Sequence, residues 1–228
     1  NVAIGFEALS TEDADGSNTA VGYRSLKTLN AGASGFNTAV GFDSGTSITE
    51  GIENTLIGGR AGDALTHADY NVAVGDQSLS ADTQGSKSTA VGHGTLFAQN
   101  FTSSTDSFNT AVGYQAGLLV TTGQQNTLIG ATAGDALTDA DYNTVVGVNA
   151  LTADTLGSRS TAVGYGALAT QNFTSATDAN NTAVGYNAGT SITTGVQNVF
   201  LGNHAGDDLN DADYNIAIGY AALDADTK

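Results

Sequence analysis

The three histidines of the chain, His67, His93 and His204, are its first candidates for acid–base catalysis. They fall at different places of an internal repeat, and no repeated serine, cysteine or acidic partner accompanies them. A catalytic residue needs partners that orient it at one defined place on the scaffold. Because these histidines have no such partners, the sequence predicts that the protein is not an enzyme.

Carboxylates are the second group of residues with possible chemistry, because oxygen-rich clusters suit Ca²⁺, which takes six to eight oxygen ligands. Aspartates recur in one turn type, as Asp63 and Asp69, as Asp135, Asp139 and Asp141, and as Asp207, Asp208, Asp211 and Asp213. A neighbouring turn type adds Asp82, Asp154 and the group Glu12, Asp13 and Asp15. We expect no cofactor other than a possible Ca²⁺ at Asp135, Asp139 and Asp141. The alternative is that these aspartates cap turns and keep the surface soluble, since no EF-hand or calcium β-roll motif is present.

Two longer turns, Gln99–Asp106 and Gln171–Asp178, each place one aromatic residue among hydroxyl side chains. Insertions in repeat proteins map to loops on one face, which is often the binding face. Phe101 and Phe173 are therefore candidates for stacking on a sugar ring. The alternative is that both rings fold back and cover the extra turn.

These residues are carried by a repeat that begins with Asn or Ser and ends four residues later with Gly. We number the repeat from this first residue, so that position one is Asn or Ser and position five is Gly. Thirteen copies are present, at spacings of 17, 19 or 21 residues. The glycines at position five are Gly5, Gly22, Gly41, Gly58, Gly75, Gly92, Gly113, Gly130, Gly147, Gly164, Gly185, Gly202 and Gly219.

A second period lies above the first, because super-repeats of 72 residues start at residues 37, 109 and 181. Within them, position nine is Leu in two successive copies and Gly in the next two. We interpret residues 1–228 as a single repeat array, and because it starts and stops in mid-pattern we expect it to be a fragment of a longer fibre.

Each copy begins with a short segment of high β propensity that a glycine closes, such as 109–113. Gly and β-branched residues recur at fixed places and no stripe of period 3.6 persists, so a helix is excluded. A second short strand is expected in many copies, for example at residues 46–49. The sequence therefore predicts an all-β fold, a parallel β-solenoid (β-roll) of about thirteen 17-residue coils.

Strand alternation places positions two and four on one face and position three on the other, and none of these positions is charged in any copy. One face can line the interior of the solenoid, so the other needs a second covering. Self-association of like chains supplies that covering. The alternative is a monomer whose outer strand face merely carries small side chains. The Asn at position one is expected to form an amide ladder, and the aromatic residues at position six are expected to pack over the neighbouring coil.

Composition excludes several partners, because the chain carries 23 acidic and 6 basic residues, a net charge of −17. Nucleic acids and anionic membranes require Lys and Arg to neutralise phosphates, so neither is an expected partner. No apolar run approaches the ~18 residues that a membrane helix needs. The chain has no cysteine, which excludes disulfides and thiolate metal sites.

The copies 109–117 and 181–189 resemble repeats of long bacterial and phage surface proteins, fibre-like proteins such as phage tail fibres. Their five-residue core is similar to the Asn-Ser-Val-Ala-Ile-Gly repeats in the YadA-like heads of trimeric autotransporter adhesins. That resemblance implies left-handed β-rolls associated as a homotrimer, although the coil of 17 residues is longer than the adhesin repeat.

The leading functional hypothesis is a structural shaft of an extracellular or viral attachment fibre, which holds a receptor-binding tip away from the particle or cell. It places the protein outside the cell, on a cell surface or on a virion. The alternative is a direct glycan-binding adhesin that uses the long coil loops. Ice binding by the Thr residues at position two is a third hypothesis, which Val2, Val72, Val199 and Ile216 weaken by interrupting the Thr column.

Overall fold

The computed structural model describes residues 1–12, 16–32 and 34–224, and in these ranges the protein is all-β without a helix. Contacts between Cα atoms divide the chain into two compact units, Asn1–Val112 and Gly113–Lys228. Across the described ranges, no helix is long and apolar enough to cross a membrane.

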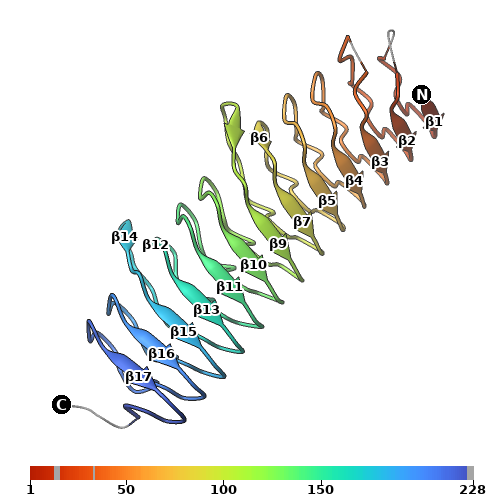
Figure 1. The fold of residues 1–228 in the computed structure, drawn as a ribbon. Coiled ribbons are helices and arrows are strands. Elements are labelled where there is room, and N and C mark those ends of the chain that lie inside the picture. Colours follow the sequence, from red (N-terminus) through yellow and green to blue (C-terminus); the bar gives the residue numbers. More distant parts are fainter. Residues whose placement is uncertain (13–15, 33, 225–228) are drawn as a thin grey trace. The chain divides into compact units, whose positions relative to one another are not determined.

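The strands of the first unit all pair in parallel and in chain order (Figure 1). Each pair joins equivalent repeat positions, as where Thr19 pairs with Thr38 and Ala20 with Ala39. The strands are β1 (Val2–Ile4), β2 (Thr19–Val21), β3 (Thr38–Val40), β4 (Thr55–Ile57), β5 (Val72–Val74), β7 (Thr89–Val91) and β9 (Thr110–Val112).

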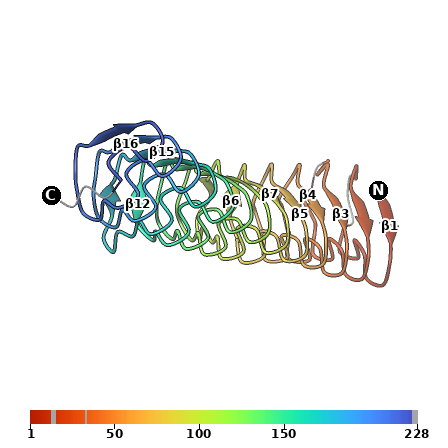
Figure 2. The same cartoon turned by 90° about the horizontal axis from the view of Figure 1, so that it is seen from below.

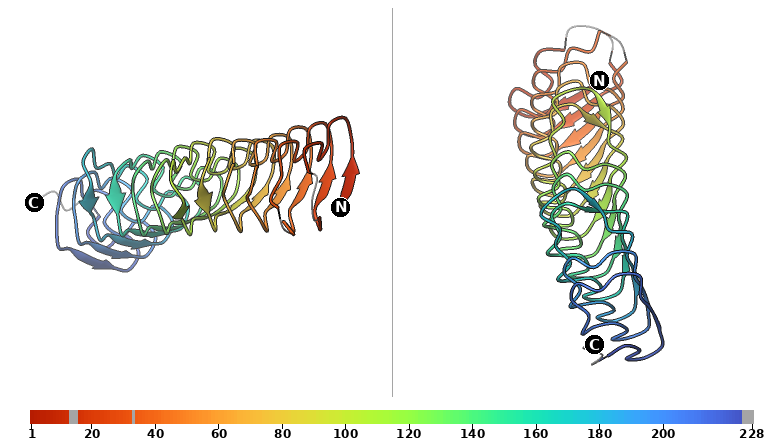
Figure 3. Two further views of the ribbon diagram at one scale, coloured as in Figure 1. Left: turned by 90° about the horizontal axis from the view of Figure 1, so that it is seen from above. Right: turned by 90° about the vertical axis from the view of Figure 1, so that its left-hand side faces the viewer.

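The second unit repeats this arrangement, and its strands also pair in parallel with equivalent positions opposite one another. Its strands are β10 (Thr127–Ile129), β11 (Thr144–Val146), β13 (Thr161–Val163), β15 (Thr182–Val184), β16 (Val199–Leu201) and β17 (Ile216–Ile218). Successive coils of each unit follow the same path between strands (Figures 2 and 3). The predicted parallel β-solenoid of about thirteen coils is confirmed.

The expected second strand at residues 46–49 is wrong, because this segment is a turn. Gly45 has a φ of 59° and its carbonyl accepts a hydrogen bond from the amide of Ile48 at 3.1 Å, which bends the chain. Second strands occur only beside the long turns in the described ranges, as pairs of two-residue strands. These are β6 (Gly85–Ser86) with β8 (Thr105–Asp106), and β12 (Gly157–Ser158) with β14 (Thr177–Asp178).

The interior is filled by positions three, eight and twelve and by a choice between Leu and Gly at position nine. Leu26 at position nine is fully buried and has a φ of 47°, a left-handed conformation that costs roughly 1–2 kcal/mol in a non-glycine residue. Burial of a leucine side chain offsets this cost with about 2–3 kcal/mol. In coils with Gly at position nine, other side chains occupy the corresponding space, since a Cβ on Gly45 would lie 2.8 Å from Cδ1 of Leu56. Core volume thus explains the alternation of Leu and Gly.

The position-five glycines stand at a corner where successive coils approach closely. Their φ angles lie between 124° and 146°, a region that is essentially restricted to glycine. At Gly130 a Cβ atom would lie 2.5 Å from the carbonyl oxygen of Gly147 in the next coil. The corner therefore needs glycine both for its backbone conformation and for the packing of one coil on another.

The asparagines at position one form a buried ladder along each unit. The Oδ1 atom of Asn37 accepts the backbone N–H of Asn54 at 2.9 Å, and Asn54 does the same for Asn71 at 2.9 Å. The Nδ2 atom of Asn54 donates to the carbonyl of Ala68 at 2.8 Å. Each side chain thus satisfies a buried amide and a buried carbonyl, and a buried polar group left unpaired would cost about 1–3 kcal/mol.

Replacement of a corner glycine tests this packing. We expect Gly130→Ala to lower the free energy of unfolding by more than about 3 kcal/mol, because it adds backbone strain to a steric clash. Gly32→Ala is the control: Gly32 also has a positive φ, 63°, but a Cβ there would meet nothing within 4 Å. Chemical denaturation followed by circular dichroism measures both, and equal losses in the two variants would contradict the close approach at the corner.

Candidate interaction surface

The structure corrects the expectation that Phe101 and Phe173 contact a glycan. The two rings are 5% and 6% exposed, so neither offers a face to a sugar. Each packs against the preceding coil, where a Cβ on Gly85 would lie 2.8 Å from Cδ2 of Phe101. The rings cover the extra turn, which is the alternative that the sequence left open.

A buried carboxylate holds each long turn in place, a role that the sequence did not indicate. Asp82 accepts hydrogen bonds from the amides of Gly85 and Phe101, at 2.9 and 3.0 Å, and from Nε2 of Gln99 at 2.6 Å. Gln99 in turn accepts from Nδ2 of Asn109 at 2.9 Å. One sequence feature marks this hydrogen-bonded group: the two coils that begin with Ser in place of Asn also have a Gln eleven residues later.

We call this hydrogen-bonded group of Asp, Gln and Asn the buried node. It recurs in the second unit around Asp154, with Gln171 and Asn181 in the places of Gln99 and Asn109. Asp154 is fully buried, and desolvation raises the pKa of its carboxyl group above the ordinary value of 3.8. Hydrogen bonds from Gln171, Phe173 and Gly157 oppose this rise but do not cancel it. The carboxylate is thus a buried charge held by three donors.

The candidate calcium ligands Asp135, Asp139 and Asp141 do not form a cluster. Asp135 accepts from the hydroxyl of Thr152 in the following coil at 2.6 Å. Asp139 and Asp141 accept from the preceding coil, from the Thr122 hydroxyl at 2.6 Å and the Gln124 amide at 2.7 Å. Each carboxylate therefore serves as a cap between coils, and the three do not form the calcium site that the sequence suggested.

Across the described residues, the one group of three acidic side chains close enough to share an ion is Asp207, Asp208 and Asp224. It lies between the last two coils, with Asp207 partly buried and Asp208 and Asp224 exposed. Asp13 and Asp15, part of the acidic group noted in the sequence, lie outside the described residues.

The histidines lie at separate places and each has a nearby carboxylate. His67 is 3.9 Å from Glu50, and His93 is 3.7 Å from Asp76. Nδ1 of His204 lies 2.6 Å from Asp207, three residues further along the chain. The structure does not bring any two of these histidines into one site.

The outer face of the strands is a surface without charge. In β11, Val145 points inward and is fully buried, whereas Thr144 and Val146 flank it on the outside. The pattern holds along both units, because position two is Thr, Val or Ile and position four is Val, Ile or Leu in every copy. Two columns, one largely of hydroxyl and one of apolar side chains, therefore run across the strands of each unit. We call this surface the strand face.

Charged side chains lie at the corners and turns instead. Arg24 pairs with Asp43 at 2.6 Å, and Arg159 pairs with Asp178 at 3.0 Å. Lys87 pairs with Asp106 at 2.5 Å. Each of these three basic groups is thus paired with a carboxylate of an adjacent coil.

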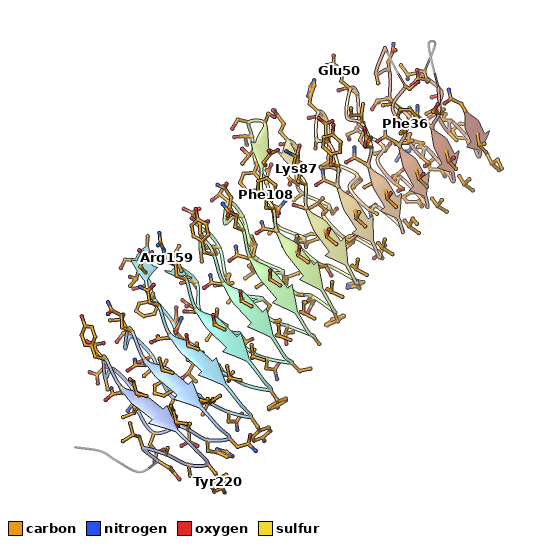
Figure 4. All side chains as sticks on the ribbon, viewed as in Figure 1. Phe36, Glu50, Lys87, Phe108, Arg159 and Tyr220 are labelled. Carbon is orange, nitrogen blue, oxygen red and sulfur yellow. The ribbon has the colours of Figure 1, made fainter. Side chains whose placement is uncertain are left out.

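Aromatic side chains border the strand face at both ends of the strands (Figure 4). At position six, the rings of Phe6, Tyr23 and Phe42 stack on one another, with centroids 5.4 and 5.3 Å apart. At the other end, Phe108 lies just before β9 and Lys87 sits over its ring, 5.4 Å from the centroid. The position-six rings thus pack over neighbouring coils, as the sequence indicated, while remaining about half exposed.

Comparisons with family models, with curated proteins and with solved structures gave no match to this chain.

Asp154→Asn tests the buried node. In the wild-type protein a carboxyl oxygen of Asp154 accepts the hydrogen bond from Nε2 of Gln171. In the variant an amide nitrogen takes the place of that oxygen, and two donors then face each other. We therefore expect the free energy of unfolding to fall by about 1–3 kcal/mol. The wild-type protein should also gain stability as the pH falls from 7 towards 3.8, because the folded state binds the proton at Asp154 first. The variant should lack that component of the gain.

Asp139→Asn is the matched control, because Asp139 is exposed and its one hydrogen-bond partner is a rotatable hydroxyl. Thermal melting at several pH values measures both variants. If Asp154→Asn melts like the control at every pH, the node does not stabilise the long turn.

Proposed function

We propose that this chain is a self-associating segment of the shaft of an extracellular or viral attachment fibre. The observation that carries the proposal is the strand face, an uncharged and largely apolar surface on a chain whose net charge is −17. A second copy of the chain is the covering that fits this face, because its own strand face has the same repeat and also lacks charge. Three chains in parallel are the preferred count, which the resemblance to trimeric adhesin heads suggests.

The energetics of the strand face favour such an association. The outward side chains at position four remain about two-fifths exposed, as at Ile57 with 40% and Ile129 with 39%. Covering one such side chain contributes roughly 1 kcal/mol at about 25 cal/mol per Å² of apolar surface. The gain repeats at every coil, so a weak contact per coil becomes a strong one along many coils. The charged corners lie outside the covered area and keep the assembly soluble.

A shaft needs no catalytic group, cofactor or unique ligand site, which agrees with a chain in which nearly every feature is repeated. Its function is to hold a receptor-binding tip at a distance from a particle or a cell. The coils themselves supply stiffness, because each is bonded to the next through backbone, Asn and Gly contacts.

A charge placed on the strand face tests the association. We expect Val146→Asp to lower the oligomeric state measured by light scattering at micromolar concentration, because burial of an unpaired carboxylate costs several kcal/mol. Ser175→Asp adds the same charge at an exposed tip of a long turn and should leave the oligomer intact.

Circular dichroism on both variants verifies that the coils still fold, since Val146 points away from the interior. A wild-type protein that is monomeric under these conditions contradicts the proposal. So does a Val146→Asp variant with the mass of the wild-type assembly.

Ice binding is a second candidate, because the Thr column at position two points outward on the strand face, as at Thr144 and Thr161. The apolar column beside it and the interruptions at Val72, Val199 and Ile216 favour association instead. Measurement of thermal hysteresis decides between them: we expect none in the wild-type protein.

A further inference from the structure

Tyr165 and Tyr186 occupy position six of two successive coils in the second unit. Their rings stack with centroids 5.3 Å apart and planes within 12° of parallel. The rings are 49% and 48% exposed, so both are accessible from solvent. The pair therefore combines proximity, alignment and access.

The backbone fixes the relative position of the two rings. β13 pairs with β15 so that Val163 lies opposite Val184, two residues before the tyrosines. Beyond the corner glycines, the carbonyl of Tyr165 accepts a hydrogen bond from the amide of Asn187 at 2.8 Å. The two side chains thus start one coil spacing apart, about 4.8 Å, and they remain neighbours through any ring motion.

We propose that Tyr165 and Tyr186 form a site for oxidative dityrosine cross-linking between adjacent coils. The oxidant is hydrogen peroxide acting through a haem peroxidase, which removes one electron and one proton from each phenol. The two phenoxyl radicals join through ring carbons ortho to the oxygens, and the two ortho hydrogens then move to the oxygens and restore both phenols. Two tyrosines and one hydrogen peroxide thus give one dityrosine and two molecules of water.

The geometry favours coupling within one chain over coupling between molecules. Two groups held in contact have an effective concentration far above that of the protein in solution. The exposed rings also have room to tilt from the stacked arrangement into the twisted geometry of a biaryl. The product links residues 165 and 186 across the coil that carries the second long turn, and it fastens that coil covalently to the next one.

The chain contains its own control for the chemistry. Tyr23 is stacked in the same way and is 41% exposed, but its neighbours in the stack are Phe6 and Phe42. Phenylalanine has no phenolic hydrogen to lose, so the Phe6–Tyr23–Phe42 stack has the same ring packing without a partner for coupling.

The test treats the intact protein with horseradish peroxidase and hydrogen peroxide, then locates cross-linked peptides by mass spectrometry. We expect one linked pair containing residues 165 and 186, with a mass lower by two hydrogen atoms and with dityrosine fluorescence. Tyr186→Phe should abolish this linked pair, whereas Tyr23→Phe should leave its yield unchanged. Both substitutions keep an aromatic ring in the stack, and circular dichroism verifies that the variants fold.

Refolding an equal mixture of isotope-labelled and unlabelled chains before oxidation separates intrachain from interchain coupling. Intrachain coupling gives linked peptides that are wholly labelled or wholly unlabelled, as we expect. Hybrid peptides at 165 and 186 would overturn the proposal, and so would dityrosine that forms elsewhere while this pair stays unlinked. The site does not depend on self-association, because both rings belong to one chain, so a monomeric protein would leave the experiment unaffected.

Discussion

The fold depends on one hydrogen bond that recurs from coil to coil. In it, the side-chain oxygen of a position-one asparagine accepts the buried backbone N–H of the position-one residue in the next coil. Asn126 makes it to Asn143, and Asn143 makes it to Ser160. The bond sets the register of successive strands because it joins equivalent positions and no others. A shift of one residue would leave the amide unpaired and turn the inward side chains outward. The close approach at the corner glycines and the identical stacking of core residues both follow from this register.

The ladder also explains where the repeat is allowed to change. The backbone amides of Ser88 and Ser160 donate to Oδ1 of the preceding asparagine in the usual way, but their own side chains carry a hydroxyl group in place of an amide. In these coils the side-chain amide of Gln99 or Gln171 accepts from Nδ2 of the next asparagine and donates to the buried aspartate, which joins the two side chains. A longer turn is thus tolerated at the coil that brings its own amide, and Phe101 and Phe173 close the space that the turn opens.

Periodicity alone predicted the coils, their parallel pairing and the position of the strands, because each repeat must place the same residue at the same point of the fold. It did not predict the paths of the turns. The segment around Ile48 has the composition of a strand, yet left-handed conformations at Asp43 and Gly45 make it a turn. The grouping of Asp135, Asp139 and Asp141 in sequence likewise did not translate into a cluster, because in a solenoid the neighbours of a residue lie one coil away and not two residues away.

The strand face is informative because the fold of a single chain does not require it to be apolar. The interior uses positions one, three, eight and twelve, with position nine in the Leu coils, and the outward positions two and four contribute no buried side chain to it in the described residues. Parallel strands at a free surface would tolerate Lys and Glu at such positions, and exposed strands often carry them to prevent association. Here every copy instead carries a hydroxyl or apolar side chain at these two positions, while charges gather at the corners. The separation is what the proposed self-association requires, because a second strand face packed against the first would exclude charge from these two positions and leave the corners in solvent.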